Sequence, residues 1–519
     1  MALKLYNTRT RTVEKFEPLR KGEVRIYVCG LTPSAQAHLG HARSFLFFDV
    51  LRRYLAHGGY RVTYVQNVTD IDDRSIKTGI ETGQDYHAIV EYFYAEFKES
   101  MRKLGVLEYD FEPYATKYIG EIQQMIRELA QSGHAYVTRD GMYYRVSTFR
   151  NYGRLANRNI ADLEAGSRIE VDEQKEDPLD FALWKFAKPG EPRWPFEPYG
   201  DGRPGWHVEC SAMARALLDP AGVGFDIHGG GADLIFPHHE NEIAQSESLM
   251  PAPPMANFWV HGGLLQFDNR KMSKSLGNFE PLYELLDRHD PQAIRLLFLQ
   301  TGYRKPMNFT EESIDGATTG LHRLLGAYDA LREAPPVKHL EAASAVAIKP
   351  FAARFYAALD EDMNTSGAVS VLFDLGAGAP ALVQSGAASH AAAFMHEAMT
   401  LLGISPVERS HRPVKVEYET SVVRFESGGS DVVFKIVAPT DAAGRLPVGT
   451  VDILRADVGG FVTLDGDAKA AVDAVVAARH RAKLAKDFGL ADRLRGALKS
   501  IGVVVTDEKE GVTWTVVGG

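Results

Sequence analysis

Apolar and polar residues alternate over residues 24–29, a period of two that predicts a β-strand. Apolar residues then recur every three or four positions from 45 to 55, which predicts a helix that ends at a pair of glycines. Residues 60–67 predict a second strand. A strand–helix–strand unit of this length indicates a parallel crossover. In such sheets ligands bind beyond the carboxyl ends of the strands, which makes residues 29–41 a candidate site.

The same periods predict the elements of the remaining chain. Helices are expected over 85–104, 117–133, 205–218, 291–301, 311–334 and 348–404, the last with breaks, and another helix is expected to begin at Pro237. Strands are expected over 224–227 and 257–260, each followed by a glycine-containing loop, at 228–231 and 261–263. Short strands mixed with loops are expected over 135–185, a β-rich segment over 413–463, a basic helix over 469–500 and a hairpin over 503–517.

This order of elements predicts an α/β protein of several domains, because 519 residues exceed what one ordinary core accommodates. We expect a Rossmann-like parallel-sheet domain, then an α-helical bundle and a small C-terminal α+β domain. The expected boundaries are 1–265 with an insertion at about 115–200, 266–310 for a connecting region, 311–410 for the bundle, 411–465 for a β-rich insert and 466–519 for the C-terminal domain.

Composition narrows the class of protein. The chain is 45% hydrophobic with a net charge of -10, so its bulk charge gives no support for nucleic-acid binding, although a local basic groove is compatible with it. Two cysteines cannot form a disulfide framework, which fits a reducing compartment. The N-terminus lacks the apolar region of a signal peptide, and no apolar run is long enough to span a bilayer. We therefore expect a soluble, cytoplasmic protein without a membrane partner.

Four residues have the chemistry of a metal site. Cys29 and Cys210 lie at the edges of predicted elements, and His238 and Glu242 stand four residues apart, on one face of the predicted helix. Together they would form a zinc site with four protein ligands. The alternative is that both cysteines are small buried apolar residues, the usual role of free cysteine. Spacing alone slightly favours that alternative, since the two are far apart and no Cys-x-x-Cys pair is present.

Two other motifs suit polyphosphate. His38-Leu-Gly-His41 precedes a predicted helix, where two imidazoles and a glycine can meet phosphate oxygens, although helix-capping histidines are the alternative. Lys271-Met-Ser-Lys-Ser275 places two lysines on a loop that can close on a polyphosphate and stabilise charge on leaving pyrophosphate. A solvated basic loop would explain the second motif alone. It does not explain both motifs in this order, each after a strand.

Three further features keep two interpretations each. His228-Gly-Gly-Gly231 offers backbone N–H groups to a ligand or is an ordinary glycine-rich loop. Trp206 would wall a side-chain pocket or lie in the core, which is the commoner outcome. Asp72 and Asp73 have carboxylates that suit catalysis, but capping or structural pairing explains them better, and we assign them no catalytic role.

Together these motifs resemble those of the cysteinyl-tRNA synthetases, a family of class I aminoacyl-tRNA synthetases. His38–His41 resembles the family's HIGH signature, and Lys271–Ser275 is its KMSKS signature intact. Residues 203–211 and 225–245 read almost as family consensus, 355–364 resembles a helix of the family's helical region, and 479–514 resembles its C-terminal domain. The resemblance covers nearly the whole chain except the β-rich insert.

The resemblance implies a ligase that activates L-cysteine with ATP to cysteinyl-adenylate and pyrophosphate, and then transfers cysteine to the 3′ end of tRNA(Cys). It implies that residues 1–265 catalyse activation, that 266–310 carry the KMSKS loop and contact the tRNA stem, and that 311–410 and 466–519 bind tRNA and its anticodon. It also implies one zinc ion per chain, Mg2+ with the ATP, and a monomer. In the family the zinc binds the substrate thiolate, and serine's harder hydroxyl is rejected.

The resemblance also assigns residues, by matching positions. The zinc ligands fall on Cys29, Cys210, His238 and Glu242. The substrate cysteine falls near Gly30, Thr32, Thr69 and Trp206. ATP falls near His38, His41, His228, Gly230, Asp233 and Lys274. The implied catalytic residues are His38, His41, Lys271 and Lys274.

Two segments depart from the family pattern, and two other functions stay open. Pro33–Ala37 replaces the commoner residues between the cysteine and the HIGH corner, and the β-rich insert has no counterpart and no known role. A cysteine ligase of the mycothiol pathway shares the activation chemistry but lacks an anticodon-type C-terminus, so the basic helix near 479–499 and the Gly511–Trp514 ending argue against it. An inactive paralogue would show damaged motifs, and no signature position is altered.

Overall fold

The structure is a computed structural model that divides the chain into two compact units, Met1–Ser410 and His411–Gly519. It describes residues 2–158, 175–267, 270–271, 281–335, 341–406, 419–427, 430–438, 503–508 and 511–516, together with residues 476, 479, 495 and 498. Most of the predicted basic helix over 469–500, and the KMSKS-like motif beyond Lys271, lie outside the described residues.

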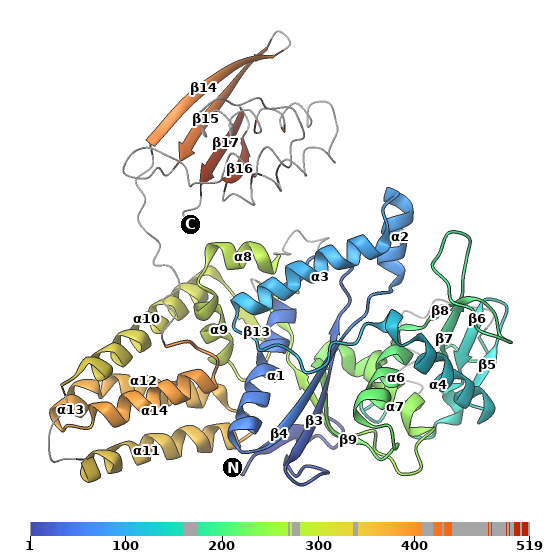
Figure 1. The fold of residues 1–519 in the computed structure, drawn as a ribbon, viewed down its shortest axis with the longest axis horizontal. Helices are drawn as coiled ribbons and strands as arrows, with labels where there is room; N and C mark the ends of the chain where they lie inside the picture. Colours follow the sequence, from blue (N-terminus) through green and yellow to red (C-terminus); the bar gives the residue numbers. More distant parts are fainter. Residues whose placement is uncertain are drawn as a thin grey trace. The chain divides into compact units, whose positions relative to one another are not determined.

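A four-stranded parallel sheet forms the centre of the first unit (Figure 1). Its strands stand in the order β10 (Ala256–Gly262), β9 (Phe225–Gly231), β3 (Glu23–Leu31) and β4 (Arg61–Val68). Helix α1 (Leu39–His57) connects β3 to β4. The chain leaves β3 toward β4 on one side and later returns to β9 on the other side, so the order of connections reverses between β3 and β9. Ligands of open α/β sheets bind at such a switch point, and the predicted Rossmann-like fold is confirmed.

The buried faces of β3 explain why its sequence forms a central strand. Val24, Ile26, Tyr27 and Val28 are all fully buried, because neighbouring strands and helices cover both faces of the sheet. Helix α1 presents apolar residues such as Phe48 and Leu51 to the same core. The first turn of α1 is thereby held at the carboxyl edge of the sheet.

Strands β9 and β10 are longer than the sequence predicted. Strand β9 continues through His228–Gly231 and β10 through Gly262, where the sequence predicted loops. Packing explains the glycines, because a Cβ on Gly229 would lie only 2.2 Å from the ring of Phe48 on α1. A strand that touches a helix so closely needs glycine, which is depleted in ordinary strands and therefore suggested a loop.

Two helix predictions also need correction. The helix expected at Pro237 begins at Glu240 as α7 (Glu240–Glu247), after a π-helical turn over Ile235–His239 in which Phe236 has an extended backbone, with φ -139° and ψ 132°. Helix α2 (Asp73–Thr82) was not predicted. Asp72 caps α2 by accepting from the backbone N–H of Arg74 at 2.8 Å, and Asp73 pairs with Lys185 and Arg203 at 2.6 Å each. The structural interpretation of both aspartates is thus confirmed.

The remaining elements of the first unit flank the sheet (Figure 1). The insertion carries the antiparallel strands β5 (Ala135–Val137), β6 (Gly141–Tyr144), β7 (Phe181–Phe186) and β8 (Gly202–Pro204), next to α4 (Ile119–Gln131) and α6 (Trp206–Leu218). A small sheet joins β12 (Arg270–Lys271), β11 (Leu265–Phe267) and β13 (Met307–Phe309). The helices are α3 (Tyr86–Lys103), α8 (Leu282–Arg288), α9 (Pro291–Leu299), α10 (Glu311–Glu333), α11 (Glu341–Asp360), α12 (Thr365–Ala377), α13 (Ala379–Gln384) and α14 (Ala388–Leu401).

The described strands of the second unit form a sheet in the order β14 (Glu419–Ser427), β15 (Ser430–Ala438), β17 (Gly511–Val516) and β16 (Val503–Glu508). Strands β16 and β17 form the predicted C-terminal hairpin. Strand β15 of the β-rich segment pairs in parallel with β17. The β-rich segment and the hairpin therefore share a sheet, which the sequence did not indicate.

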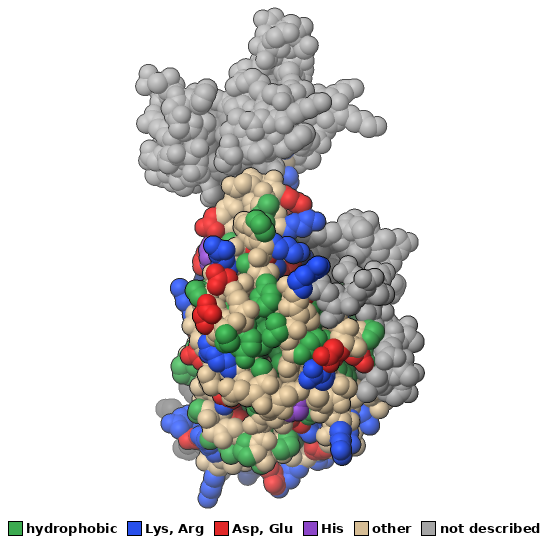
Figure 2. Space-filling model, turned by 90° about the vertical axis from the view of Figure 1, so that its right-hand side faces the viewer, with side chains coloured by type: hydrophobic (Ala, Val, Ile, Leu, Met, Phe, Trp, Pro, Cys, Tyr) green, Lys and Arg blue, Asp and Glu red, His purple; other side chains and the backbone are tan. Residues whose placement is uncertain are grey.

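The surface of the described chain carries both charge signs. Lys and Arg side chains are interspersed with Asp and Glu side chains on the face that Figure 2 shows. Among the helices of the described residues, none combines the length and the hydropathy needed to cross a bilayer.

A buried arginine joins the helical region to the sheet domain. Arg295 on α9 is 1% exposed, donates to the carbonyls of Leu402 at 2.7 Å and Leu104 at 3.0 Å, and pairs with Asp49 on α1. Gly403 packs directly against its guanidinium and has a left-handed backbone, with φ +71°. A Cβ at Gly403 would lie 2.0 Å from Nη2 of Arg295.

We predict that Gly403→Ala lowers the free energy of unfolding of the first unit by roughly 1–3 kcal/mol, because it adds backbone strain and displaces Arg295. Gly326→Ala is the matched control, since Gly326 lies inside α10 and a Cβ added there would meet no atom within 4 Å. That change should raise stability by about 0.5–1 kcal/mol. Urea unfolding of both variants measures the effect, and equal stability of the two would contradict it.

Candidate functional site

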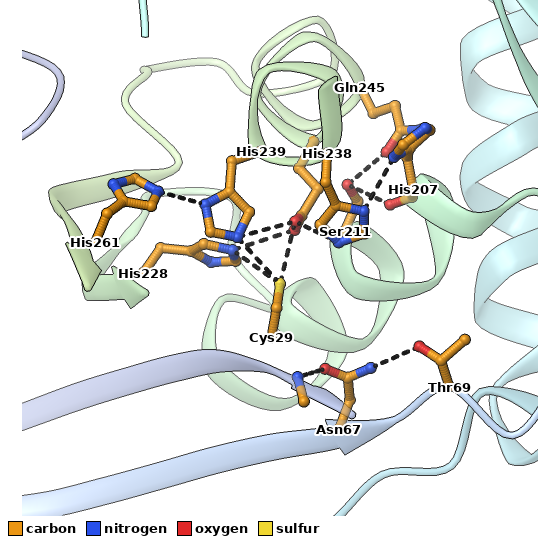
Figure 3. Close-up of polar contacts among 12 residues, drawn as sticks. Cys29, Asn67, Thr69, His207, Ser211, His228, His238, His239, Gln245 and His261 are labelled. Atoms are coloured by element: carbon orange, nitrogen blue, oxygen red, sulfur yellow. Dashed lines mark hydrogen bonds and ion pairs between the residues drawn. The ribbon is translucent and has the colours of Figure 1, made fainter. Parts of the chain in front are cut away.

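Four predicted metal ligands converge at the carboxyl edge of the sheet. Figure 3 shows two of them, Cys29 and His238, among their polar neighbours. Cys29 comes from β3, Cys210 from α6, His238 from the π-helical turn and Glu242 from α7. All four are buried, and their ligand atoms lie within 4.8 Å of one another. Glu242 Oε1 is 3.1 Å from His238 Nε2 and 3.3 Å from Cys29 Sγ. The residues that sequence spacing left ambiguous thus form one compact donor set.

A second donor set overlaps the first. Cys29 and Glu242 also lie within 4.8 Å of the ring nitrogens of His228 and His239. His228 Nε2 is 3.6 Å from Cys29 Sγ and 3.4 Å from Glu242 Oε2, and His239 Nε2 is 3.3 Å from Cys29 Sγ. Cys29 and Glu242 therefore stand between two pairs of nitrogen or sulfur donors.

Outer hydrogen bonds orient the imidazoles. His238 Nδ1 contacts His207 Nδ1 at 3.0 Å, and His239 Nδ1 contacts His261 Nε2 at 2.7 Å (Figure 3). His261 is held in turn by Thr8 Oγ1 at 2.8 Å. With Nδ1 engaged, the Nε2 atoms of His238 and His239 face Cys29 and Glu242. Such outer partners fix the ring orientation of metal-ligating histidines.

The electrostatics of the cluster favour a bound cation. Burial opposes the charge on Glu242, but the imidazoles of His228 and His238 lower its pKa well below the usual range. Burial raises the pKa of the Cys29 thiol, whereas hydrogen bonds with Cys29 and His238 outweigh burial at Cys210 and lower its pKa to about 6. Despite burial, the Glu242 carboxylate raises the pKa of His238 to about 10.

Two polar atoms in the cluster have no hydrogen bond, namely His228 Nδ1 and Glu242 Oε2, and Oε2 has only a loose ionic contact with His228 Nε2, at 3.4 Å. A buried carboxylate oxygen without a hydrogen bond is costly unless a cation neutralises it. Two thiols, an imidazole and a carboxylate are the ligand types that zinc takes in proteins. The residues present therefore fit a zinc ion.

The residues expected near the substrate cysteine lie beside this cluster. Gly30 follows Cys29, and its N–H donates to Asn67 Oδ1 at 2.8 Å. A Cβ at Gly30 would lie 1.7 Å from the carbonyl oxygen of Asn67, so only glycine fits there. Asn67 Nδ2 donates to Thr69 Oγ1 at 3.3 Å, and Thr69 is buried after β4. Thr32 is half-buried in the turn that leads to α1.

Trp206 is not a core residue, because 43% of its surface is exposed at the start of α6. Its ring lies over that of His238, with the centroids 4.3 Å apart. The indole thus forms a partly open wall beside the donor set, which is the pocket interpretation of this residue.

The HIGH-like corner both caps α1 and fixes the tautomers of its histidines. His38 is the N-cap, and its Nδ1 accepts from the backbone N–H of Gly40 at 3.1 Å. His41 Nδ1 accepts from the N–H of His38 at 3.2 Å. The rings stack with centroids 3.8 Å apart. Since both Nδ1 atoms accept, each ring in its neutral form carries its proton on Nε2. Burial lowers the pKa of His41 to about 3, with a smaller contribution from the neighbouring His38.

The other residues expected near ATP occupy different environments. Gly230 lies near the end of β9, where a Cβ would meet Leu234 at 2.8 Å, and Asp233 is exposed just beyond it. His228 is fully buried and stacks on Tyr27, so it lies in the histidine cluster and not at a surface that a nucleotide reaches. Lys274 and the side chain of Lys271 lie outside the described residues.

Sequence reasoning missed several members of the site. No role was assigned to His207, His239, His261, Asn67 or Glu209. Glu209 is 1% exposed, its Oε2 makes no hydrogen bond, and burial raises the pKa of its carboxyl group. The sequence signal that could have identified them is their position next to residues of the predicted site or near the end of a strand. His207 and Glu209 flank Val208 in the Trp-His-Val-Glu-Cys run, His239 adjoins His238, and His261 is the second-last residue of β10.

Comparison with known proteins gives a consistent result over nearly the whole chain. A family model described as "tRNA synthetases class I (C) catalytic domain" matches residues 15–319. Models of a DALR domain and of a "Cysteinyl-tRNA ligase anticodon binding domain" match residues 354–405 and 465–514.

Individual relatives agree with these families. A cysteine–tRNA ligase from Chromohalobacter salexigens is 42% identical over 517 residues, which is 99% of this chain and 100% of that protein. One from Alkalilimnicola ehrlichii is 42% identical over 516 residues, 99% of each. Among solved structures, a methionyl-tRNA synthetase from Mycobacterium tuberculosis in complex with methionyl-adenylate has a TM-score of 0.57 at 13% identity, over 73% of this chain and 91% of that one, a likeness of fold.

We predict that zinc occupies the donor set with two thiols, because soft thiolates bind it well and because Glu242 lies closer to His238 than to His228. Cys210→Ser should reduce bound zinc from one ion per chain to a small fraction after dialysis, whereas His239→Gln should retain most of it. Metal content is measured by atomic emission.

Cobalt substitution provides a second readout. Two thiolate ligands should give about twice the near-ultraviolet thiolate-to-cobalt absorbance of one. The opposite ranking of Cys210→Ser and His239→Gln, together with single-thiolate absorbance, would place the ion between His228 and His239.

Proposed function

We propose residue roles for a chain that belongs to the cysteinyl-tRNA synthetases, a family of class I aminoacyl-tRNA synthetases. Its reaction is the ligation of cysteine to tRNA(Cys), through ATP-dependent activation to cysteinyl-adenylate and transfer to the 3′ end of the tRNA. The observation that supports the roles most strongly is the buried Cys29–Cys210–His238–Glu242 donor set beside the N-terminus of α1.

The donor set selects the amino acid. One zinc ion held by its four residues would supply a soft Lewis acid that binds a thiolate far better than the hydroxyl of serine. Trp206, which covers His238, walls the pocket for the small side chain. Gly30, Thr32 and Thr69 border the same pocket, and the Asn67 bridge between Gly30 and Thr69 keeps its floor rigid.

The first turn of α1 binds the ATP phosphates. Both histidines present Nε2–H groups as donors, and their orientation is fixed by the helix cap before any nucleotide binds. Donors held in place in this way stabilise charge without reorganisation. Gly230 and Asp233 border the adenosine, Lys271 and Lys274 approach the phosphates, and Mg2+ would arrive with the nucleotide. We assign His228 to the support of the donor set instead of to ATP.

The chemistry then has two steps. The cysteine carboxylate attacks the α-phosphorus in line, so that a new P–O bond forms as the bond to pyrophosphate breaks. His38, His41 and Lys274 stabilise the negative charge that grows on the phosphate oxygens, and Lys271 neutralises the leaving pyrophosphate. The terminal adenosine hydroxyl of the tRNA next attacks the adenylate carbonyl, and AMP leaves.

The helical region and the C-terminal residues carry the tRNA. The matches to a DALR domain and an anticodon binding domain support this division, with 311–410 along the tRNA and 466–519 at the anticodon. Residues 266–310 connect the active site with the tRNA stem. Action as a monomer in the cytoplasm stays a prediction, and so does any role of residues 411–465.

Activity measurements test the function. We expect cysteine-dependent exchange of pyrophosphate into ATP, followed by charging of tRNA(Cys), with a preference for cysteine over serine on the order of 10⁴. Exchange without charging, but with ligation of cysteine to glucosaminyl-inositol, would reassign the chain to the amino-sugar ligases. Absence of exchange in a zinc-loaded, folded protein would contradict an active enzyme.

A single substitution separates the two roles of His38. His38→Asn should retain the helix cap, because asparagine is a favoured N-cap residue, while removing the imidazole donor. We expect adenylate formation to slow by roughly 10²–10³-fold with a change in unfolding free energy below about 0.5 kcal/mol.

His38→Ala is the matched control for that substitution. It removes the donor and the cap together and should cost a further ~1 kcal/mol of stability with a similar loss of rate. Wild-type rates in His38→Asn would show that the imidazole serves only as a cap.

A further inference from the structure

Arg43 is a buried cation immediately behind the HIGH-like corner, two residues after His41 on α1. It is 5% exposed. Its Nη1 donates to the carbonyls of Gly263 and Leu264 at 3.2 and 3.1 Å. Its Nη2 donates to those of Gly302 and Lys305 at 3.2 and 2.6 Å. No ion pair of Arg43 exists among the residues that the structure describes, so four carbonyl dipoles on two loops are its partners.

The two loops lead into the small sheet that carries the start of the KMSKS-like motif. Gly263–Leu264 connects β10 to β11, whose partner β12 ends at Lys271. Residues 302–305 precede β13, which pairs with the other edge of β11. The loops touch each other, because a Cβ at Gly263 would lie 2.6 Å from the carbonyl oxygens of Arg304 and Lys305. Arg43 thus holds both loops that lead into this sheet.

The far end of the same segment is attached to the other side of the corner. The N–H of Leu282, the first residue of α8, donates to the carbonyl of Ala37 at 2.8 Å. His38 and Pro281 form an antiparallel bridge at the same place. Gly263–Leu264 and Leu282, which lie at the two described ends of this segment, are therefore attached to residues on either side of His38–His41, through Arg43 at one end and the Ala37 carbonyl at the other.

We propose that Arg43 is a positioning residue for the activation step, which sets the distance between the HIGH-like corner and the KMSKS-like segment. This rests on the proposed assignment of ATP to these two motifs. Only a guanidinium, with its planar fork of donors, reaches two carbonyls on each of two loops at once, and an ammonium group does not. A charge buried without a carboxylate is unfavourable, and a role confined to stability is served better by apolar residues.

Arg43→Lys tests the proposal, because it keeps the charge but loses the fork. We expect kcat of cysteine-dependent ATP–pyrophosphate exchange to fall ten- to hundredfold, since small displacements of reacting groups have effects of this size. The KM for cysteine, the zinc content and the rate of transfer from preformed cysteinyl-adenylate to tRNA(Cys) should each stay within about threefold of wild type.

Arg25→Lys is the matched control. Arg25 is a buried arginine at the opposite end of β3, 6% exposed, that donates to the carbonyls of Leu218 and Gly224 and, unlike Arg43, also pairs with a carboxylate, that of Asp226 at 3.6 Å. The Arg25→Lys variant should lose thermal stability to a similar extent as Arg43→Lys, but its exchange rate should stay within about threefold of wild type. An equal loss of exchange in both variants, or an equal loss of exchange and transfer in Arg43→Lys, would overturn the proposal.

A second pair of variants applies if Arg43→Lys does not fold. Leu282→Pro removes the N–H that bonds to Ala37, at the first helical position where proline is tolerated, and Leu282→Ala keeps that N–H. Slower exchange in Leu282→Pro than in Leu282→Ala supports the attachment of the segment at both ends, and equal rates contradict it. Lys274→Ala separates failure of the Arg43 proposal from failure of the ATP assignment, because a wild-type exchange rate in that variant would contradict the ATP assignment itself.

Discussion

The carboxylate of Glu242, buried without access to water, is the constraint on which the site depends. Ionised groups in the interior require a counter-charge or a full set of hydrogen bonds. Glu242 is 0% exposed and is surrounded by the imidazoles of His228, His238 and His239. Those rings come from β9 and from the turn before α7, so the site exists only when β9 lies next to β3. The chemistry of the site therefore requires this order of strands in the sheet.

This requirement also explains the unusual composition of β9. The strand must bring His228 beside Cys29 and also let α1 approach the sheet at Gly229, where no side chain fits against Phe48. One strand thus combines a buried histidine with three glycines. The close approach of α1 in turn places His38 and His41 at the edge of the sheet where β3, which carries Cys29, ends. The contact between Gly229 of β9 and Phe48 of α1 therefore aligns the donor set with the HIGH-like corner.

Elements with a local signal were predictable from the sequence, and those that depend on distant contacts were not. Strand β3, helix α1 and the helices after residue 291 follow the hydrophobic period closely. The glycines after Ile227 suggested a loop, because the residue that requires glycine at position 229, Phe48, is remote in sequence. The parallel pairing of β15 with β17 has no local signal either, since 72 residues separate the end of β15 at 438 from the start of β17 at 511.

The candidate site shows the same division. Residue types and motif resemblance identified Cys29, Cys210, His238 and Glu242, and the structure brings them together. The outer histidines were not identified, because their role is to orient other rings, and only coordinates reveal which nitrogen faces which. The resemblance assigned His228 to ATP, whereas the structure buries this residue fully and places its ring in the second donor set, with Cys29, His239 and Glu242.

The segment Pro33–Ala37, where the chain departs from the family's usual residues, links the two halves of the site. Its main connection to the rest of the protein is the backbone carbonyl of Ala37, which accepts from the N–H of Leu282 at 2.8 Å. Its side chains contribute Ala37, which is 2% exposed in the main hydrophobic core, and a longer contact of 3.4 Å between Gln36 Nε2 and the Tyr283 hydroxyl. A bond through the backbone depends on the path of the chain and not on the side chains along it. The half-buried positions 34–36 can therefore change their residues while the backbone still holds His38 and α8 together, so that the donor set and the HIGH-like corner keep their spacing.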